Sequence, residues 1–335
     1  MDGLASRLQN FLSHRLQCDV AIESLVRYPV GFSWMTYAFT LVEQGTGARP
    51  PRDLVLRLAP PVGILPPYRA KPEFDVLSAV DGHGVPVPKP FFYGDDPGDL
   101  GAPFLICSKC PGDPLTLMGV LPAAGQIPAF TKLAHEFTEI LGRLHNIDWR
   151  ASLGDAMAAG ATAANIAARQ VDHWNRIAES ISRPLPLLKL AHRWLLENAP
   201  VAPRLVIVHG DYRLGNFLAR ENIDAILDWE LVHIGDPHED LGWALLSSFN
   251  GRSDKLFGVV PREAVFEQYE RVTGVSVQPP SVAYYEILAL FKLAVICLSG
   301  SHAFFAGNSL DLRLVVLGSN ARMMLKSLAE RLERM

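Results

Sequence analysis

The 335-residue sequence predicts an α+β fold of two parts, a small antiparallel sheet with one helix followed by a larger, mostly helical part. Strand-like segments separated by turns occupy residues 28–110, whereas helical periodicity dominates residues 130–335. The composition changes at the turn-forming stretch CPGDP, residues 110–114. We therefore expect a boundary there, with one part formed by residues 1–110 and the other by residues 111–335.

Composition and charge narrow the classes of function. Hydrophobic residues make up 49% and charged residues 20%, which is typical of a globular protein with a sizeable core. The formal net charge of -4 offers no basic surface for nucleic acid or an anionic membrane, although a local positive patch can still hold a phosphate group. The most apolar segment, residues 282–306, is interrupted by Glu286 and Lys292, so we expect a buried helix and a soluble, cytoplasmic protein.

The four cysteines, Cys18, Cys107, Cys110 and Cys297, include one close pair in the sequence CSKC. A zinc site would need a second pair at a suitable spacing, and a redox pair would be expected to open a helix rather than to precede the turn CPGDP. We therefore expect ordinary thiols in a reducing compartment.

The elements of the first part follow from residue spacing. Apolar residues at helical spacing in residues 4–12 predict an N-terminal helix that docks on the rest of the protein. The segments YAFTLVEQ (37–44) and DLVLRLA (53–59) flank the turn GTGARPP and predict an antiparallel hairpin. The segment KPEFDVLSAVDGHG (71–84) predicts a short helix that ends at glycine, and PFLICSK (103–109) predicts a further strand.

The second part is predicted to be helical on both sides of a short β region. Residues 130–148 place their apolar side chains on one face, as an amphipathic helix does. Residues 151–199 are alanine-rich and helical with a break at RPLP (183–186), and residues 237–335 are helical apart from PP and GN turns. The β region between them contains the polar sequence VHGDYRLGNFL, residues 208–218.

This polar sequence sets an imidazole, a carboxylate and a carboxamide between hydrophobic flanks. The segments FLA and IDAIL that follow are joined at EN and predict a hairpin, which brings Asp211, Asn216 and Asp228 to neighbouring strand ends. One carboxylate can orient a hydroxyl and accept its proton, while a carboxamide and a second carboxylate can hold Mg²⁺, an ion that prefers oxygen ligands. This set therefore predicts phosphoryl transfer from ATP.

The order and spacing of these motifs resemble those of a known family. His209-x-Asp211, with Asn216 five residues further, resembles the catalytic loop of protein kinases, and Asp228 in L-D-W-E takes the place of the metal-binding aspartate of D-F-G. H-G-D-x-x-x-x-N followed by L-D-W-E and G-D-P-x-x-D resembles the aminoglycoside phosphotransferase family, and especially the kinase-like domain fused to some acyl-CoA dehydrogenases. The resemblance covers nearly the whole chain.

The resemblance implies a protein-kinase-like fold, with an ATP-binding lobe of residues 1–110 and a catalytic and substrate-binding lobe of residues 111–335. It implies transfer of the γ-phosphate of ATP to a hydroxyl of a small molecule, with Mg²⁺ as the second cofactor. In this scheme Asp211 accepts the hydroxyl proton, and Asn216 and Asp228 bind the metal ion.

The resemblance also assigns residues around the phosphates of ATP. The turn GFSWMTY, which contains Ser33 and Thr36, covers the phosphates, although Trp34 stands where a small polar residue is expected. Arg57 replaces the strand lysine that contacts the α- and β-phosphates, and a guanidinium can also bridge phosphate oxygens. Glu73 is its partner on the following helix. Without the downstream motif, Arg57 and Glu73 would be ordinary surface residues.

The strand FLICSKC resembles the hinge whose backbone holds adenine, here through the Ser108 carbonyl and the Cys110 N–H. Such contacts use backbone groups, so the side chains of the hinge matter little. An ordinary edge strand has the same sequence pattern, and the two interpretations stay open.

Other polar residues near these motifs receive structural interpretations first. His209 is expected to brace the loop, and Asp236 to serve in a turn or cap a helix. Asp240 is expected to bind the loop backbone, as the family resemblance suggests, with a merely solvated carboxylate as the alternative. Glu230 either contacts metal-bound water or forms a salt bridge elsewhere. Two histidines are expected at the surface and one tryptophan in the core: His233, His238 and Trp243.

Two other functions are weighed against the kinase. Residues 209–240 contain a dense group of histidines and aspartates, as two-metal hydrolases do, but no H-x-H pair and no H-E-x-x-H. A catalytically weak, nucleotide-binding pseudokinase is the second alternative, because Arg57 and Trp34 depart from the expected ATP site.

The acceptor is the least determined feature. Acidic and basic residues are balanced in the C-terminal helices, which gives no preference for a polycationic aminoglycoside. The aromatic and aliphatic segment 282–306 suits an acceptor with an apolar part, such as a hydroxyacyl-CoA or an antibiotic-like (macrolide-like) alcohol. We expect a monomer or a homodimer that acts on a small molecule without nucleic acid or a membrane.

Overall fold

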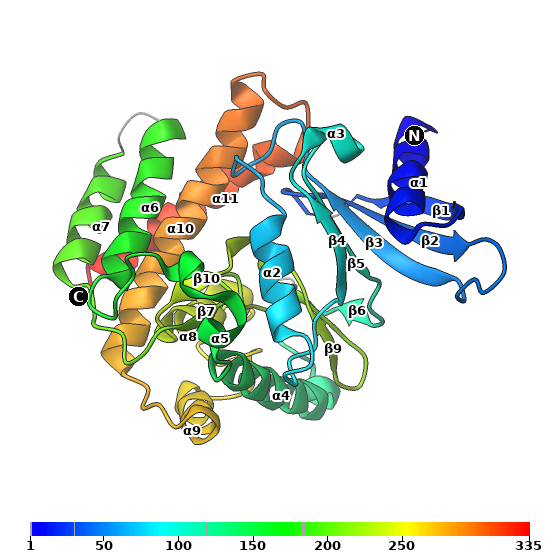
Figure 1. Ribbon diagram of the computed structural model, residues 1–335. Coiled ribbons are helices and arrows are strands. Elements are labelled where there is room, and N and C mark those ends of the chain that lie inside the picture. Colours follow the sequence, from blue (N-terminus) through cyan, green and yellow to red (C-terminus); the bar gives the residue numbers. More distant parts are fainter. Residues whose placement is uncertain (1, 30, 118–119, 182–184) are drawn as a thin grey trace.

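The computed structural model describes residues 2–29, 31–117, 120–181 and 185–335 (Figure 1). An antiparallel sheet forms the N-terminal part, and helices packed around one long helix form most of the C-terminal part (Figure 1). The α+β fold class predicted from the sequence is therefore confirmed.

The N-terminal sheet has five strands in the order β1-β2-β3-β5-β4, and each neighbouring pair is antiparallel. β2 and β3 form the predicted hairpin, with Thr36 opposite Arg57. Alternation along β3 buries Leu54, Leu56 and Leu58, while Arg57 faces the other side of the sheet. The five strands are β1 (Val20–Tyr28), β2 (Met35–Glu43), β3 (Arg52–Leu58), β4 (Pro90–Gly94) and β5 (Phe104–Ser108).

The two outer strands differ from the prediction. β1 begins at Val20 rather than near residue 28, because an edge strand exposes most of its side chains and this one is interrupted by a bulge at Ser24, whose φ is 53°. β4 lies in the proline-rich segment 85–96, for which the sequence predicts only an extended connection. Pro90 is compatible with β4 because this strand has a partner on one side only.

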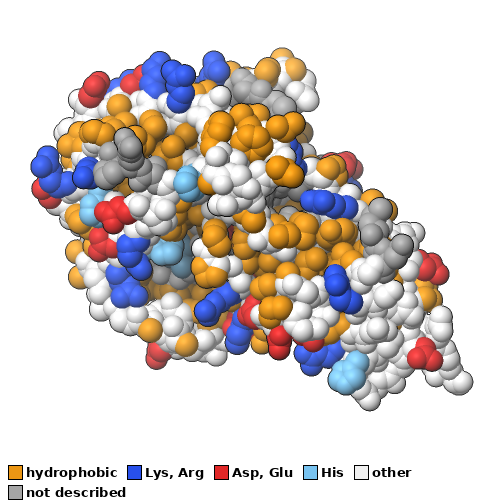
Figure 2. Space-filling view, turned by 90° about the horizontal axis from the view of Figure 1, so that it is seen from above, with side chains coloured by type: hydrophobic (Ala, Val, Ile, Leu, Met, Phe, Trp, Pro, Cys, Tyr) orange, Lys and Arg blue, Asp and Glu red, His pale blue; other side chains and the backbone are white. Residues whose placement is uncertain are grey.

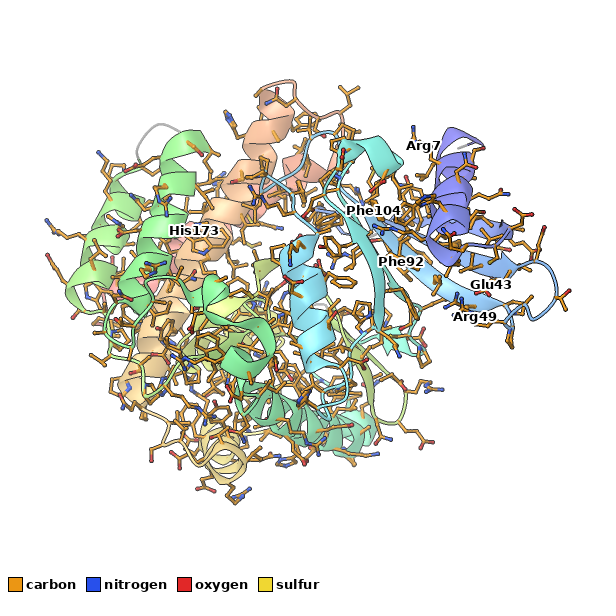
Figure 3. All side chains as sticks on the ribbon, viewed as in Figure 1. Arg7, Glu43, Arg49, Phe92, Phe104 and His173 are labelled. Atoms are coloured by element: carbon orange, nitrogen blue, oxygen red, sulfur yellow. The ribbon has the colours of Figure 1, made fainter. Side chains whose placement is uncertain are left out.

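Helices cover both faces of the sheet. On one face, α1 (Asp2–Leu16) docks as predicted, with Phe11 edge-on to Phe104 and Phe92 at ring-centre distances of 4.9 and 6.1 Å. Figure 3 labels Phe92 and Phe104 on the sheet and Arg7 on α1. The short α3 (Pro97–Leu100) contacts α1 on this side. On the other face, α2 (Lys71–Val80) buries an apolar side together with Glu73.

The C-terminal part is largely helical, as predicted, but it departs from the prediction at residues 250–261. The predicted break at RPLP lies between α6 and α7, but residues 182–184 are outside the described residues. Residues 250–261 do not form a helix, because Gly251 and Gly258 adopt positive φ and the Asn250 side chain bonds backbone groups across the turn. The helices are α4 (Ile127–His145), α5 (Trp149–Leu153), α6 (Ile166–Ile181), α7 (Pro186–Glu197), α8 (His238–Ala244), α9 (Arg262–Thr273), α10 (Pro279–Phe305) and α11 (Arg313–Leu332), with 3-10 turns η1 (Ala124–Gln126), η2 (Asp155–Ala158), η3 (Trp229–Leu231) and η4 (Ser247–Phe249).

α10 is the central helix of this part (Figure 1). By length and composition it could cross a membrane, yet 67% of its most apolar window is buried inside the protein, as expected of a core helix. The two charges that interrupt its sequence are both 1% exposed and ion-paired, Glu286 with Arg262 and Arg331, and Lys292 with Glu239. The predicted buried helix is confirmed.

Short strands frame the polar loop of residues 209–216. β7 (Val206–Val208) pairs with β10 (His233–Gly235), and β8 (Phe217–Ala219) pairs with β9 (Ile223–Ile226) and with β6 (Asp113–Pro114). Because β6 pairs with β8 of the C-terminal part, we keep residue 110 as the proposed boundary between the two parts.

An aromatic cluster supports the loop from below. Phe137 of α4 contacts Tyr212, Phe217 and Phe257 at ring-centre distances of 4.1, 5.3 and 5.0 Å. Removing a buried aromatic side chain such as Phe137 costs about 3–5 kcal/mol of stability. The apolar face of α4 therefore packs against the loop and fixes its position.

The outer surface mixes side chains of both charges. Figure 2 shows a face on which hydrophobic side chains spread between separate acidic and basic groups. Four large hydrophobic residues near the junction of α10 and α11 are 58–92% exposed: Phe305, Leu310, Leu312 and Val316.

Candidate active site

The second residue of the polar loop is a glycine that no other residue can replace without strain. Gly210 has a φ of +84°, and a Cβ there would lie 2.6 Å from the Leu231 carbonyl oxygen. This close approach explains the middle residue of the HGD motif by backbone geometry.

Asp240 of α8 holds the loop backbone, as predicted. Its carboxylate accepts hydrogen bonds from the N–H groups of His209 and Gly210, at 2.7 and 2.9 Å, and lies 3.2 Å from His145 Nε2. Burial disfavours the charged carboxylate, but these partners outweigh burial and hold the pKa of Asp240 below its usual value. The loop is thus tied to α8 by a buried charge.

His209 braces the loop, which confirms its structural interpretation. Its Nε2 lies 3.0 Å from the Leu227 carbonyl oxygen, and its Nδ1 lies 3.2 Å from the backbone nitrogen of Asp211. Burial lowers the pKa of His209. The neutral ring with a proton on Nε2 satisfies both contacts.

Asp211 is held by three donors. Arg213 Nε and Trp243 Nε1 donate to Oδ1 at 2.7 and 2.6 Å, and Asn216 Nδ2 donates to Oδ2 at 2.5 Å. The Asp211 side chain keeps 14% exposure, so the carboxylate is fixed in direction but still reachable.

Asn216 is oriented by the same contacts. Its Nδ2 donates to the Asp211 carbonyl at 3.0 Å as well as to the carboxylate, which leaves the side-chain carbonyl oxygen for another partner. The Leu227 N–H donates to the backbone carbonyl of Asn216 at 2.6 Å, so Asn216 lies beside the segment that ends at Asp228.

Arg57, Glu73 and Asp228 meet between the sheet and the C-terminal part. Arg57 forms an ion pair with Glu73, and its Nη2 lies 2.8 Å from Asp228 Oδ1. The side chains of Arg57 and Glu73 are 14% and 4% exposed, so neither is an ordinary surface residue. Asp228 has a positive φ of 67°, which is strained for a residue with a side chain, and it keeps 37% of that side chain exposed.

The turn before β2 contains Ser33 and Trp34, as predicted. Trp34 is 6% exposed and packs edge-on against Tyr68, and the Arg57 guanidinium lies 5.6 Å from its ring centre. The two residues that depart from the expected ATP site therefore contact each other. Ser33 Oγ donates to Tyr68 Oη at 3.1 Å, and Thr36 lies opposite Arg57 on the neighbouring strand.

The predicted hinge ends β5. β5 lies between β3 and β4, so the alternative of an edge strand is wrong. The Ser108 N–H donates to the Lys89 carbonyl at 2.9 Å, and the Ser108 carbonyl lies 4.0 Å from the Cys110 sulfur. All four cysteines are free, and burial raises the pKa of Cys107 to about 12, which makes this thiol unreactive.

Glu230 lies close enough to Asp228 for the two charges to interact. Burial and the Asp228 charge raise the pKa of Glu230 to about 8, while Arg57 and Ser33 act in the opposite direction. This carboxyl is therefore largely protonated at neutral pH.

Two residues that hold Asp211 were missed by sequence reasoning. Arg213 follows Asp211 by two positions, which is a usable local signal, and its guanidinium lies 5.0 Å from the Phe249 ring centre. Trp243 is 1% exposed, as expected for the core, but its N–H also reaches the Asp211 carboxylate. Periodicity cannot reveal a contact between residues so far apart in the chain.

Two histidines differ from the surface positions predicted for them. His238 is 1% exposed, since its Nδ1 lies 2.7 Å from Asp236 and its Nε2 accepts the Gln278 N–H. His233 is partly buried and lies 3.1 Å from Glu239. Asp236 serves the predicted turn by accepting the His238 N–H at 2.9 Å.

The histidines and aspartates of residues 209–240 have separate partners, such as Arg57 for Asp228, Arg213 for Asp211 and Asp236 for His238. Among the residues that the structure describes, no group of three or more His, Cys, Asp and Glu side chains could hold a metal ion. The two-metal hydrolase interpretation therefore gains no support.

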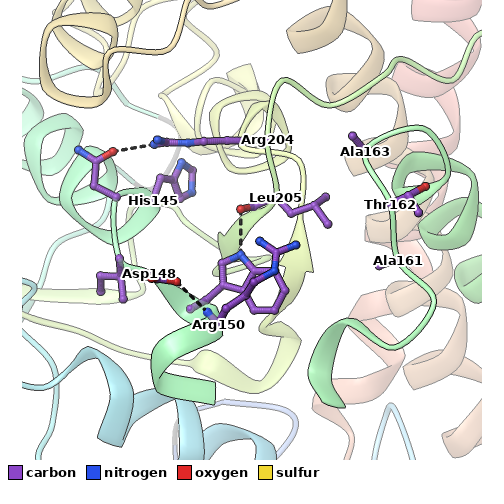
Figure 4. A pocket seen from close by; sticks show the side chains of 11 residues that line it. His145, Asp148, Arg150, Ala161, Thr162, Ala163, Arg204 and Leu205 are labelled. Atoms are coloured by element: carbon purple, nitrogen blue, oxygen red, sulfur yellow. Dashed lines mark hydrogen bonds between the residues drawn. The ribbon is translucent and has the colours of Figure 1, made fainter. Parts of the chain in front are cut away.

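A pocket of about 640 Å³ lies beside His145 and Arg204 (Figure 4). It is lined by His145, Arg150 and Arg204, and the Trp149 N–H donates to the Leu205 carbonyl at 2.9 Å on its wall. The pocket is linked to the catalytic loop through the contact between His145 and Asp240, and Asp228 is not one of its lining residues.

Comparison with known families gives one match over most of the chain. The profile of the phosphotransferase enzyme family, APH, matches residues 26–279. Acyl-CoA dehydrogenase family member 10 of Mus musculus is 29% identical over 296 residues, which cover 81% of this chain and 26% of that protein. The chain thus spans about a quarter of the length of this curated relative.

Solved structures share the fold. A Ralstonia eutropha protein described as a candidate aminoglycoside phosphotransferase superposes with a TM-score of 0.71 at 22% identity, covering 98% of both chains. A thermostable mutant of an aminoglycoside phosphotransferase, in ternary complex with AMP-PNP and hygromycin B, has a TM-score of 0.55 at 16% identity, covering 98% of this chain and 99% of that one. The predicted kinase-like phosphotransferase fold is confirmed.

Proposed function

The chain belongs to the phosphotransferase enzyme family and is a small-molecule kinase, and we propose that it transfers the γ-phosphate of ATP to a hydroxyl group in a Mg²⁺-dependent reaction. One observation carries the proposal: an orienting carboxylate (Asp211), a carboxamide bonded to it (Asn216) and an exposed carboxylate (Asp228) are held at neighbouring strand ends. Phosphoryl transfer needs this combination of groups.

Asn216 and Asp228 would hold Mg²⁺. The Asn216 nitrogen is used by Asp211, so its carbonyl oxygen remains for a cation, and the Asp228 side chain is 37% exposed. Two oxygen ligands fit a hard divalent ion that takes its other ligands from water and phosphate. The bound ion would supply neutralisation of the charge on the phosphates.

Arg57 would bind the α- and β-phosphates, positioned by Glu73. A guanidinium has five N–H donors, so Arg57 can keep its contact with Glu73 while it contacts phosphate oxygens. Its present contact with Asp228 is the one that has to change when phosphates and a metal ion arrive.

Four further groups would complete the nucleotide site. Ser33 and Thr36 are proposed to face the phosphates from the turn before β2 and from β2 itself. The Ser108 carbonyl and the Cys110 N–H are proposed to bind adenine, because β5 leads there from the sheet into the C-terminal part.

Asp211 would orient the acceptor hydroxyl in line with the γ-phosphate and take its proton as the new O–P bond forms. Oδ1 accepts from both Arg213 and Trp243, whereas Oδ2 accepts from Asn216. A carboxylate oxygen accepts two hydrogen bonds readily, so Oδ2 has capacity for the hydroxyl.

For the acceptor, we propose an alcohol with an apolar part, such as a hydroxyacyl-CoA or a macrolide-like antibiotic. The first choice is supported by a curated relative whose name is that of an acyl-CoA dehydrogenase family member. We further propose that the protein acts in the cytoplasm as a monomer or homodimer, without nucleic acid or a membrane. The mixed charge of the surface supports this part of the proposal.

A catalytically weak, nucleotide-binding pseudokinase is the second candidate, and one observation favours it. Arg57 forms an ion pair with Asp228, which competes with metal binding at that carboxylate. Nucleotide binding without phosphoryl transfer would support this alternative.

The test measures ADP release from Mg-ATP with a panel of hydroxyacyl-CoA thioesters, macrolides and aminoglycosides. Asp211→Asn should lower turnover of an accepted alcohol by about 10²–10⁴-fold and leave Mg-ATP binding intact. Unchanged turnover in Asp211→Asn would contradict the role of Asp211. Tight Mg-ATP binding without ADP release on any member of the panel would favour the pseudokinase.

A further inference from the structure

We propose that Trp243 is a positioning residue, whose indole N–H fixes the direction of the Asp211 carboxylate and whose ring is fixed in turn by the buried Lys292–Glu239 ion pair. The inference rests on the proposed function of Asp211, which is to orient the acceptor hydroxyl. It goes beyond that function by naming a group that sets the orientation from outside the catalytic loop.

The contact between Trp243 and Asp211 is short and shielded. Trp243 Nε1 lies 2.6 Å from Asp211 Oδ1, and Trp243 is 1% exposed. An indole nitrogen can only donate, and a hydrogen bond to an ionised carboxylate is stronger than one between neutral groups. Water has little access to compete for the indole N–H, so this bond restricts rotation of the carboxylate.

Trp243 acts from the same helix that holds the loop backbone. Asp240, three residues before Trp243, binds the N–H groups of His209 and Gly210. Residues three apart lie on one side of a helix, so α8 sets both the path of the loop and the direction of its carboxylate. α8 is itself fixed, since a Cβ at Gly242 would lie 2.9 Å from the Cβ of Tyr285 on α10.

The indole ring is held by a buried ion pair. The Lys292 ammonium lies 4.9 Å from the Trp243 ring centre and 2.8 Å from Glu239 Oε1. Glu239 stands four residues before Trp243, on the same side of α8. Lys292 and Glu239 are 1% and 3% exposed, and Glu239 also contacts His233 at 3.1 Å.

A buried ion pair is weak evidence for stability, because desolvation offsets its attraction, whereas it can fix a single arrangement. Here the arrangement that it fixes is the position of the ring that donates to Asp211. A tryptophan that only filled the core would gain nothing from an N–H directed at the proposed catalytic carboxylate.

The test compares Trp243→Phe with Trp149→Phe. Trp149 is 3% exposed and its N–H donates to the Leu205 carbonyl at 2.9 Å, on α5 and outside the catalytic loop. Both replacements remove one indole N–H bond to oxygen and a similar part of a buried ring. Steady-state kinetics with Mg-ATP and the panel alcohol that gives the fastest ADP release would be measured together with calorimetric Mg-ATP affinity and Tm.

We expect Trp243→Phe to lower kcat by about 10- to 100-fold, because a slightly misplaced catalytic group costs rate rather than binding. The KM of the alcohol and the Kd of Mg-ATP should stay within about threefold of wild type. The reason is that Trp243 is 1% exposed and acts on Asp211 rather than on either substrate. Trp149→Phe should keep kcat within about twofold at a comparable loss of Tm. Equal kcat values in the two variants would overturn the inference.

Asp211→Asn separates this inference from the proposed function on which it rests. If Asp211→Asn remains active, the function of Asp211 is wrong and the inference falls with it. If Asp211→Asn is inactive while Trp243→Phe is not impaired, only the inference fails.

A measurement without any acceptor tests the contact itself. The Trp243 indole proton, assigned by its absence from the NMR spectrum of Trp243→Phe, should move upfield in Asp211→Asn, because a neutral amide is a weaker partner than a carboxylate. The Trp149 indole proton should not move. An unchanged Trp243 signal would overturn the inference.

Discussion

The catalytic loop and the proposed nucleotide site around Arg57 are held in different ways. Three donors fix the Asp211 carboxylate, and Asp240 binds two N–H groups of the loop, all within the C-terminal part. On the nucleotide side, the Arg57 guanidinium joins Glu73 to Asp228 between the sheet and the C-terminal part. We infer that the loop is organised before substrates bind, whereas the nucleotide side exchanges an ion pair when they bind.

The difference separates two kinds of contribution. Groups fixed in advance need no reorganisation during the reaction, so the loop should contribute to the rate of transfer. The Arg57–Asp228 ion pair has to open before these side chains can bind phosphate and metal, so substitutions there should change nucleotide affinity instead. Substitutions on the two sides are therefore expected to affect different quantities.

The largest effect is expected for Asp240→Ala. Removing this carboxylate leaves two buried N–H groups and His145 without their partner, which should lower the free energy of unfolding by about 3–5 kcal/mol. Urea denaturation measures the change. Asp155→Ala is the control, because that side chain is 87% exposed and its loss should change stability by less than about 0.5 kcal/mol. Similar values for the two variants would show that the loop is not held by α8.

Lys292→Met should have the next largest effect. It leaves the buried Glu239 carboxylate with His233 as its remaining ion-pair partner, and should lower the free energy of unfolding by about 3 kcal/mol. Denaturation of Lys292→Met, of Glu239→Gln and of the double variant Lys292→Met/Glu239→Gln measures the coupling. The double variant should recover part of the loss, and a loss equal to the sum of the single variants would show that the pair is not coupled.

Low pH should weaken the Lys292–Glu239 ion pair that holds the Trp243 ring. Burial would raise the pKa of Glu239, but Lys292 and His233 outweigh burial and lower it from 4.5 to about 2. The resulting stabilisation is present above about pH 4.5 and is lost as the pH falls toward 2, by about 3 kcal/mol in total. The pH dependence of unfolding between pH 5 and pH 2 should therefore be flatter in Glu239→Gln than in wild type. Equal slopes would contradict the ion-pair assignment.

The smallest of these effects is expected on the nucleotide side. Arg57→Lys keeps a positive charge near Glu73 but loses the planar guanidinium that can bridge two partners. Mg-ATP affinity should fall by about tenfold, or about 1.4 kcal/mol, with a smaller change in stability. Calorimetry measures the affinity. An unchanged Kd would show that Arg57 does not bind the phosphates.

The sequence predicted which candidate residues lie close together where these residues are on elements adjacent in the chain. Asp211, Asn216 and Asp228 lie before, at the start of and after the short hairpin of β8 and β9, so their proximity follows from the turn. The pairing of Arg57 with Glu73 follows from a strand and the next helix. Both predictions depend on elements that are neighbours in the chain.

Contacts between distant segments could not be predicted in the same way. Arg57 reaches Asp228 across 171 positions, and Trp243 reaches Asp211 from another helix. Periodicity shows that Trp243 is buried but not which atom its N–H faces. The burial of His238 could not be predicted either, because its partner Gln278 lies at the start of another helix, α10.

The most direct test of the account is Mg-ATP binding by calorimetry to wild type, Asp228→Ala and Asp75→Ala. Asp75 is the matched control, since its side chain is also 37% exposed and also forms an ion pair, with Lys71. We predict that wild type and Asp75→Ala bind ATP in a Mg²⁺-dependent way, and that Asp228→Ala binds at least about tenfold more weakly. Equal Mg-ATP affinity in all three folded proteins, or none in wild type, would contradict a kinase site at Asp228.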